Sequence, residues 1–261
     1  MFLGTPGRIH ARYSAMDAAD FSKFERVLYQ VLKQSITIQS IPAIIWGEPA
    51  NSAYLYVHGK MSQKEEAEGF ATIAAGKGYQ VVSFDLPEHG ERKSQDYQCT
   101  VQNAEHDLRT INDFVTGKWQ NVCLFGSSLG AYFSLVACQE IKFGKCLFLS
   151  PILDMERLIQ NMMGWFNVSE ALLKEKQEIP TPMGETLSWP YYQYVREHPI
   201  IKWENETYIL YGSNDHLTER HIVDTFANRF HCHLEVLQNG EHYFHTKEQM
   251  ETANGWLNQN I

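Results

Sequence analysis

The sequence predicts an α/β protein built on a doubly wound, mostly parallel eight-stranded sheet flanked by helices. Eight short runs of β-branched or aromatic residues alternate with stretches of helical periodicity. Runs such as 121–125 and 146–149 are continuously apolar, which is typical of strands that helices cover on both faces of a parallel sheet. Only Ile41 and Pro42 separate the first two runs, too few residues for a crossover, so we expect an antiparallel edge there.

The predicted elements follow one another in a βαβα rhythm. The strands are expected at residues 36–40, 43–46, 53–57, 79–83, 121–125, 146–149, 207–211 and 233–237. Ser62 and Glu65 have the spacing of a capping box, which predicts that a helix begins there. Further helices are predicted where apolar residues recur at 104, 108, 111 and 115, over 131–141, and at 250, 253 and 257.

One long segment, residues 151–205, interrupts this rhythm after the sixth strand. It is rich in methionine and aromatic residues, with Pro180, Pro182 and Pro190 as helix breakers. We expect a small helical insertion, which either packs its own aromatic side chains or forms a lid over an apolar acyl or aryl pocket. Residues 36–150 and 206–261 would then form the core. Residues 1–35 are predicted to form a helical N-terminal extension around Phe21, Phe24, Leu28 and Val31.

Composition narrows the class of protein. With 22 basic and 31 acidic residues among 261, the net charge of −9 argues against nucleic acid or an anionic membrane as partner. No apolar run approaches the roughly 18 residues of a membrane-spanning helix, and no apolar signal-peptide core is visible near the start. The five cysteines form no C-x-x-C pair, which favours free thiols in a reducing compartment. We therefore expect a soluble cytoplasmic protein.

The segment Gly126-Ser127-Ser128-Leu129-Gly130 fits the pattern G-x-S-x-G. A predicted strand runs directly into it and a predicted helix follows. Such a tight reversal strains the backbone of the central residue and leaves no room for side chains two positions before and after it. The pattern predicts that Ser128 is a nucleophile projecting above the sheet. The alternative is a serine that only caps the helix.

A nucleophilic serine needs a histidine base, and that histidine needs an orienting carboxylate. In this architecture both come later in the chain, the acid first, each in a loop after a strand. Asp215 follows the strand 207–211, and His242 follows the strand 233–237. We therefore assign Asp215 as the acid and His242 as the base. Alternatives remain for both roles: Asp154 for the acid, and His216 or His245 for the base.

An oxyanion hole requires two backbone donors that are fixed before charge develops. The N–H of Leu129, just after the nucleophile, is the first expected donor. The second should come from the loop after strand 53–57, where we assign the Lys60 N–H, with Met61 as the alternative. The Lys60 side chain, His58 and His89 are expected to be structural or to face solvent.

Together these motifs resemble the α/β-hydrolase superfamily over residues 36–258. The resemblance rests on His58-Gly59, on Asp85-Leu86-Pro87-Glu88-His89-Gly90, on the turn at Ser128, and on Gly212 with Asp215 and Gly240 with His242. The loop after His58-Gly59 is similar to small carboxylesterases of the serine-aminopeptidase-like and cinnamoyl (feruloyl) esterase type. Glu88 stands where those families usually carry a second glycine. The resemblance implies an α/β-hydrolase fold with a small lid after strand six, a Ser128–His242–Asp215 triad and an ester substrate.

The expected activity is that of a serine hydrolase that cleaves carboxylic esters through an acyl-enzyme intermediate. A thioesterase, an acyltransferase or a small peptidase would use the same triad, and a non-catalytic ligand-binding scaffold is the remaining alternative. No metal or cofactor is expected, because no H-E-x-x-H, Cys/His cluster, G-x-G-x-x-G or Walker loop is present. The expected partner is a small-molecule ester, with a homodimer left open. Residues expected to contact it are Met61, Met163, Trp165, Phe166, Trp189 and Tyr192.

Overall fold

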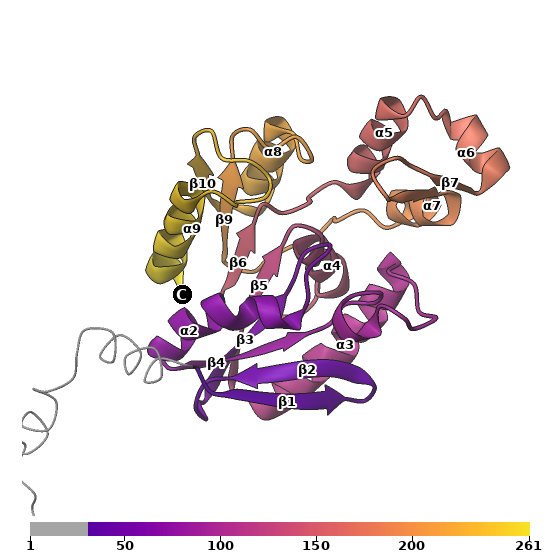
Figure 1. Ribbon diagram of the computed structural model, residues 1–261. Coiled ribbons are helices and arrows are strands. Elements are labelled where there is room, and N and C mark those ends of the chain that lie inside the picture. Colours follow the sequence, from indigo (N-terminus) through magenta and orange to yellow (C-terminus); the bar gives the residue numbers. More distant parts are fainter. Residues whose placement is uncertain (1–30) are drawn as a thin grey trace, which may run out of the picture.

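A computed structural model describes residues 31–261 of the chain (Figure 1). Its eight-stranded sheet has the order β1-β2-β4-β3-β5-β6-β9-β10. β2 pairs antiparallel with β1 and with β4, and all other neighbours in this sheet are parallel. The predicted fold class is therefore confirmed, including the antiparallel edge. The predicted helix around Phe21, Phe24 and Leu28 lies outside the described residues. The end of the predicted extension, residues 31–35, is not helical: Val31 precedes β1 and Lys33 to Ser35 belong to it.

The strands lie close to their predicted positions. They are β1 (Lys33–Ile38), β2 (Ile41–Trp46), β3 (Ser52–Val57), β4 (Tyr79–Phe84), β5 (Asn121–Ser127), β6 (Cys146–Leu149), β9 (Thr207–Gly212) and β10 (His233–Leu237). The first turn was misplaced: it consists of Gln39 and Ser40, and Ile41 and Pro42 belong to β2. Gln39 makes the turn with a φ of +54°, and the Pro42 carbonyl accepts the Asp85 N–H across 3.0 Å.

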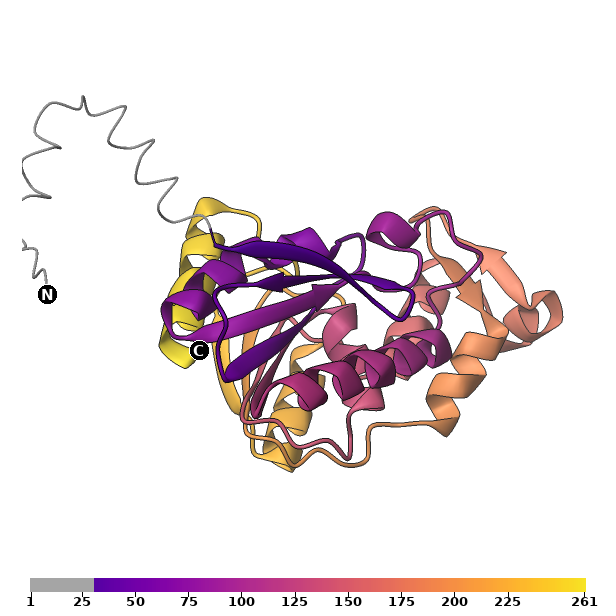
Figure 2. The ribbon, with the colours of Figure 1, turned by 90° about the horizontal axis from the view of Figure 1, so that it is seen from below.

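Helices cover both faces of this sheet (Figures 1 and 2). α2 (Glu68–Gly76) and α9 (Lys247–Asn260) pack on one face, where Phe70 and Trp256 join an apolar cluster with Tyr54 and Phe125. The other face carries α3 (Val101–Lys118), α4 (Leu129–Ala137) and α8 (Arg220–Phe230) in a larger cluster. Burial on both faces accounts for the continuously apolar central strands.

The helix after β3 does not begin with the predicted capping box. A 3₁₀ turn, η3 (Lys64–Ala67), precedes α2, and no side chain of its own segment caps it. Instead the Lys64 N–H donates to Asp85 Oδ1 across 2.9 Å, from the loop after β4. A carboxylate distant in sequence thus satisfies the first N–H of η3, whereas the capping box had predicted a local bond from Ser62 to the Glu65 N–H.

Between β6 and β9 the chain forms a separate group of elements, here called the insertion (residues 151–205). It contains α5 (Met155–Trp165), α6 (Glu170–Lys176), β7 (Glu178–Pro180), β8 (Thr186–Ser188) and α7 (Trp189–Glu197). β7 and β8 pair as an antiparallel hairpin, which was not predicted. Figure 1 shows the insertion grouped at the end of the molecule opposite β1 and β2.

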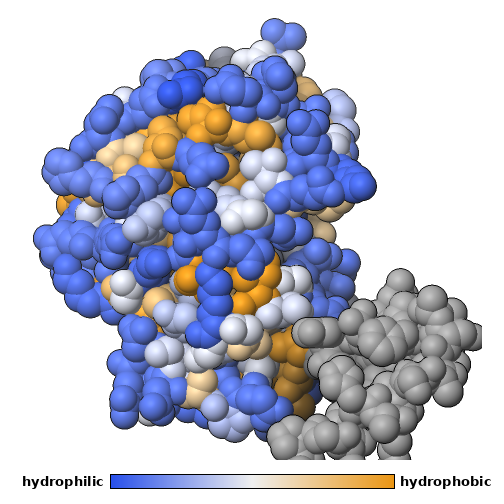
Figure 3. All heavy atoms as spheres, turned by 90° about the vertical axis from the view of Figure 1, so that its left-hand side faces the viewer, coloured by the Kyte–Doolittle hydropathy of each residue, from blue (hydrophilic) through white to orange (hydrophobic). Residues whose placement is uncertain are grey.

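The surface on the side of α9 and β10 is mostly hydrophilic, with apolar side chains gathered between the charged ones (Figure 3). Among the helices of residues 31–261, none has the length and apolar character needed to cross a bilayer. The five cysteines are unpaired, and Cys123, Cys138 and Cys146 are buried.

Candidate active site

Ser128 occupies a sharp turn between β5 and α4. Its backbone has φ +48° and ψ −116°, a conformation that residues with a side chain rarely adopt. The turn requires a residue without a side chain at position 130, because a Cβ there would lie 2.4 Å from the Val57 carbonyl oxygen. The Ser128 side chain makes no hydrogen bond that caps α4, which argues against the capping alternative. Its Oγ lies 2.8 Å from His242 Nε2 instead.

Asp215 and His242 complete a chain of hydrogen bonds that begins at Ser128. His242 Nδ1 donates to Asp215 Oδ2 across 2.7 Å, so its Nε2 is free to accept from the Ser128 hydroxyl. The Asp215 side chain is fully buried. Its other oxygen, Oδ1, accepts the backbone N–H groups of Leu217 (2.8 Å) and Thr218 (3.1 Å). These two donors fix the carboxylate in the orientation that His242 requires.

The loops that carry Asp215 and His242 are in close backbone contact. They follow β9 and β10, which are neighbouring parallel strands. A Cβ on Gly212 would lie 2.4 Å from the Gly240 carbonyl oxygen, and the same oxygen accepts the Asn214 N–H across 2.8 Å. Glycine at 212 therefore permits the backbone approach that brings the acid and the base together.

The structure leaves the three alternative residues out of this arrangement. Asp154 is the N-cap of α5, where its Oδ1 accepts the Arg157 N–H across 2.9 Å. His216 and His245 are exposed, and His245 Nδ1 lies 2.9 Å from the Tyr243 carbonyl oxygen.

The expected oxyanion donors lie on either side of Ser128. Leu129 is the first residue of α4, so its N–H has no acceptor within the helix, and both Leu129 and Lys60 line the pocket at Ser128. The N–H of Met61, the alternative donor, is engaged by His89 Nε2 across 3.2 Å. Within residues 31–261 the N–H groups of Leu129 and Lys60 make no hydrogen bond. The ammonium of Lys60 pairs with Glu185 at 2.6 Å.

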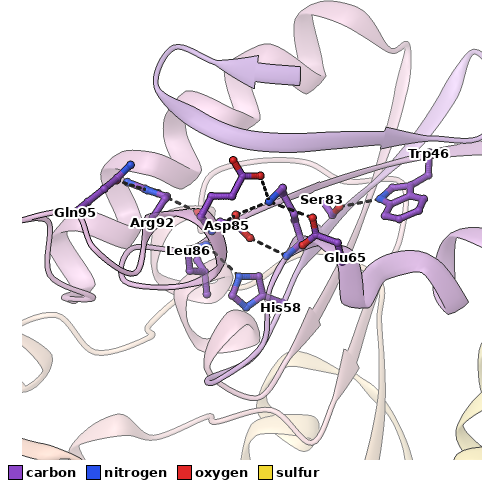
Figure 4. A network of polar contacts seen from close by, with 10 residues as sticks. Trp46, His58, Glu65, Ser83, Asp85, Leu86, Arg92 and Gln95 are labelled. Atoms are coloured by element: carbon purple, nitrogen blue, oxygen red, sulfur yellow. Dashed lines mark hydrogen bonds and ion pairs between the residues drawn. The ribbon is translucent and has the colours of Figure 1, made fainter. Parts of the chain in front are cut away.

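A buried polar network supports the loop after β4 (Figure 4). Asp85 is fully buried, and its Oδ2 accepts Lys64 Nζ (2.7 Å) and the Glu91 N–H (3.0 Å). Burial opposes the charge on Lys64, but its hydrogen bonds to Asp85 and Glu91 outweigh that effect and raise the pKa of the Lys64 ammonium. The network thereby ties this loop to the start of η3.

A pocket of about 500 Å³ opens beside Ser128. One stripe of α5 provides much of its apolar wall, at helical spacing: Met155, Leu158, Ile159, Met162 and Trp165. The rest of the lining includes Ile152, Leu187, Tyr191, Leu217 and the polar Glu88, Gln98, Cys99, Thr100, Glu178 and Glu185. Within the part of the chain that the structure describes, no three His, Cys, Asp or Glu side chains are arranged to hold a metal ion.

Of the six residues expected to contact substrate, only Trp165 lines this pocket. Met163, Trp189 and Tyr192 are buried within the apolar core, and Met61 is 89% exposed outside the pocket. Phe166 follows the end of α5 and also lies outside the lining. The prediction selected methionine and aromatic residues by type alone. The spacing 155, 158, 159, 162, 165 would have identified the one face of α5 that lines the pocket.

Comparisons with known proteins agree on the fold. No profile of a known protein family matches the chain. The hydrolyase PoxO of Penicillium oxalicum is 27% identical over 121 residues, which are 42% of this chain but only 28% of that protein. Est1E from Butyrivibrio proteoclasticus, solved with ferulic acid bound, superposes with a TM-score of 0.68 at 15% identity, covering 87% of this chain and 96% of that one.

Two further solved structures show the same likeness. An esterase from Pyrococcus furiosus superposes with a TM-score of 0.63 at 16% identity, over 94% of this chain and 93% of the esterase. Alpha/beta hydrolase domain-containing protein 10 from mouse has a TM-score of 0.67 at 16% identity, covering 87% of this chain and 97% of the mouse protein. At these identities the likeness establishes the fold of the chain.

Proposed function

We propose that this chain, which has the α/β-hydrolase fold, is a serine hydrolase that cleaves carboxylic esters through an acyl-enzyme intermediate. One observation carries the proposal. The hydrogen-bonded series Ser128 Oγ, His242 Nε2 and Nδ1, and Asp215 Oδ2 lies beside a largely apolar pocket. The names of the similar proteins, which are hydrolases and esterases, support the same class.

In the proposed acylation step, Ser128 Oγ attacks the carbonyl carbon of the ester while His242 Nε2 takes the hydroxyl proton. The carbonyl oxygen becomes an oxyanion, which the N–H groups of Leu129 and Lys60 would bind. The N-terminus of α4 adds its positive dipole end at the same place. Asp215 stabilises the imidazolium form of His242 and keeps its ring oriented.

The tetrahedral intermediate then collapses. Its carbon–oxygen bond to the alcohol breaks, and Nε2 of His242 returns the proton to the departing alkoxide. In deacylation a water molecule takes the place of the alcohol: His242 accepts a water proton, the hydroxyl attacks the acyl carbon, and Ser128 leaves with the proton. The carboxylic acid is released and the enzyme is restored.

We further propose that residues 36–150 and 206–261 act as the catalytic core and the insertion as a lid. The apolar stripe of α5 faces the pocket that Ser128 also lines, so it would receive an apolar acyl or aryl group. Burying such a group contributes roughly 0.8 kcal/mol for each methylene removed from water.

A panel of substrates tests the proposal and separates it from its rivals. The protein and its Ser128→Ala variant would be assayed on p-nitrophenyl esters from acetate to octanoate, aryl esters, acyl-CoA thioesters and aminoacyl arylamides. We expect turnover of oxygen esters that the variant loses, with unchanged circular dichroism. Turnover of thioesters or arylamides alone would replace the esterase by a thioesterase or peptidase. Tight ligand binding without any turnover would indicate a binding scaffold.

A further inference from the structure

His89 is buried in the loop after β4 and makes two hydrogen bonds to backbone, with only 4% of its surface exposed. Nδ1 lies 2.7 Å from the Pro87 carbonyl oxygen, which can only accept, so Nδ1 carries the proton. Nε2 lies 3.2 Å from the Met61 N–H, which can only donate, so Nε2 must present its lone pair. A neutral imidazole protonated at Nδ1 is the one form that satisfies both partners.

His58 makes the reciprocal connection from the loop after β3. Its Nδ1 donates to the Gly59 carbonyl across 2.7 Å, and its Nε2 accepts the Leu86 N–H across 3.1 Å. Figure 4 shows the ring of His58 lying beside Leu86. Each of the two loops therefore supplies an imidazole that accepts an N–H from the other, and the two rings are 5.2 Å apart.

Met61 is held in an unusual conformation at the point where His89 binds it. Its φ of +61° lies in the left-handed region, which a methionine rarely adopts. Its side chain is 89% exposed, so packing does not impose this conformation. The hydrogen bond to His89 is the contact that the Met61 N–H makes, and it fixes the peptide next to the one that carries the Lys60 N–H.

We propose that His89 is a positioning residue for ester hydrolysis: by holding the Met61 N–H, it sets the loop so that the Lys60 N–H is the oxyanion donor. The inference rests on the proposed function of the Ser128 site and adds to it the residue that selects the second donor. His89 acts through Met61 and does not itself touch the substrate.

The role requires His89 to stay neutral, because a protonated Nε2 would be a donor facing another donor. The charged and titratable groups that face it are Lys60 and His58 from the loop after β3, and Asp85 and Glu88 from its own loop. Burial is the main influence and lowers the pKa of His89. This direction agrees with the neutral tautomer that the hydrogen bonds to Pro87 and Met61 require.

The test compares His89→Ala, His89→Gln and a control, His106→Ala, on p-nitrophenyl butyrate beside the wild type and Ser128→Ala. His106 is exposed on α3 and takes part in none of these hydrogen bonds. We expect His89→Ala to lower kcat about 10- to 100-fold with KM changed less than about threefold, since a donor used only in the transition state is misplaced. His89→Gln should recover most of kcat, because its amide oxygen can accept the Met61 N–H.

A trifluoromethyl ketone gives a second reading, because its adduct with serine carries an oxyanion. Its affinity should fall in His89→Ala by a factor similar to kcat, and stay unchanged in His106→Ala. If wild type and Ser128→Ala differ as expected but His89→Ala keeps the kcat and inhibitor affinity of wild type, the inference is wrong and the proposed function stands. If the wild type shows no Ser128-dependent turnover, both are wrong.

A measurement on the unmodified protein covers the case in which His89→Ala does not fold. Two-bond ¹H–¹⁵N correlation spectra report which imidazole nitrogen carries the proton. We expect His89 protonated at Nδ1 alone at neutral pH. A ring protonated at Nε2, or at both nitrogens, would overturn the inference, because Nε2 could then not accept the Met61 N–H.

Discussion

Asp215 Oδ2 accepts the His242 Nδ1–H across 2.7 Å and joins two loops that are 27 residues apart in sequence. The other oxygen of Asp215 is held by the backbone N–H groups of Leu217 and Thr218. The carboxylate therefore cannot rotate away from His242 without losing two hydrogen bonds. This rigidity determines which nitrogen of His242 faces Ser128 with a free lone pair.

Replacing Asp215 by asparagine should disturb the orientation and tautomer of His242 while leaving the fold intact. In Asp215→Asn the amide oxygen can keep the Leu217 and Thr218 N–H groups, while the NH₂ group faces His242 Nδ1. His242 would then carry its proton on Nε2 and could not accept from Ser128. We expect kcat to fall by about 10³- to 10⁴-fold with the melting temperature little changed. Activity within tenfold of wild type would show that Asp215 does not orient the base.

Gly130 should tolerate no side chain. A Cβ there would lie 2.3 Å from the His58 carbonyl oxygen and 2.4 Å from that of Val57, and both belong to the backbone. We expect Gly130→Ala to lower the free energy of unfolding by about 2–4 kcal/mol in urea denaturation and to abolish activity.

Gly117→Ala is the matched control for this substitution. Gly117 lies in α3, and a Cβ there would meet nothing within 4 Å. The alanine should raise stability by about 0.5–1 kcal/mol, because glycine is the poorer helix former. Equal effects at both positions would mean that the close approach at Gly130 is not what the fold requires.

Stability should fall on acidification because His58 is buried in its neutral form. Burial lowers the pKa of His58 from 6.5 to about 4. Between these values the unfolded chain binds a proton that the folded protein does not, so stability is present above pH 6.5 and lost as the pH falls towards 4. Burial also lowers the pKa of His89, so His89 likewise makes the folded protein less stable on acidification.

Urea denaturation at pH 7.5 and pH 5 measures this dependence. The His58 contribution is on the order of 3 kcal/mol over the whole interval. His58→Asn should be less stable than wild type at pH 7.5 but should lose less on going to pH 5. A wild-type stability that is flat or rises towards pH 5 would contradict a neutral buried His58.

Filling the pocket should change which esters are cleaved. Met162 lines the pocket from α5, so Met162→Trp should lower kcat/KM for p-nitrophenyl octanoate at least about tenfold relative to acetate. Leu172→Trp is the control, since Leu172 is 37% exposed on α6 and lies outside the lining. The same selectivity in both variants would place the acyl group elsewhere.

The sequence predicted the fold class and the strand positions well because hydrophobic periodicity and apolar runs are local signals. The apolar runs needed burial on both faces, and the structure provides it with helices on each side. The positions of Ser128, Asp215 and His242 could be predicted because each follows a strand, and parallel strands end at one edge of the sheet. Their hydrogen bonds follow from that placement.

Features that depend on distant contacts could not be predicted in this way. Asp85, and not Ser62, satisfies the first N–H of η3, because the loop after β4 folds back onto it. The prediction of substrate contacts from residue type was wrong for Trp189 and Tyr192. Both are large and aromatic, but they fill the interior of the insertion. The engagement of Met61 by His89 likewise becomes visible only when two loops are brought together.

The measurement that tests the central claim most directly is the intact mass, followed by peptide mapping, of the protein after reaction with a fluorophosphonate. Wild type, Ser127→Ala and Ser128→Ala would be treated side by side, since Ser127 is the adjacent serine without a role in the proposed chemistry. We predict a single adduct on Ser128 in wild type and Ser127→Ala, and none in Ser128→Ala. An adduct that survives in Ser128→Ala, or no adduct on a folded wild-type protein, would contradict the assignment of Ser128 as the nucleophile.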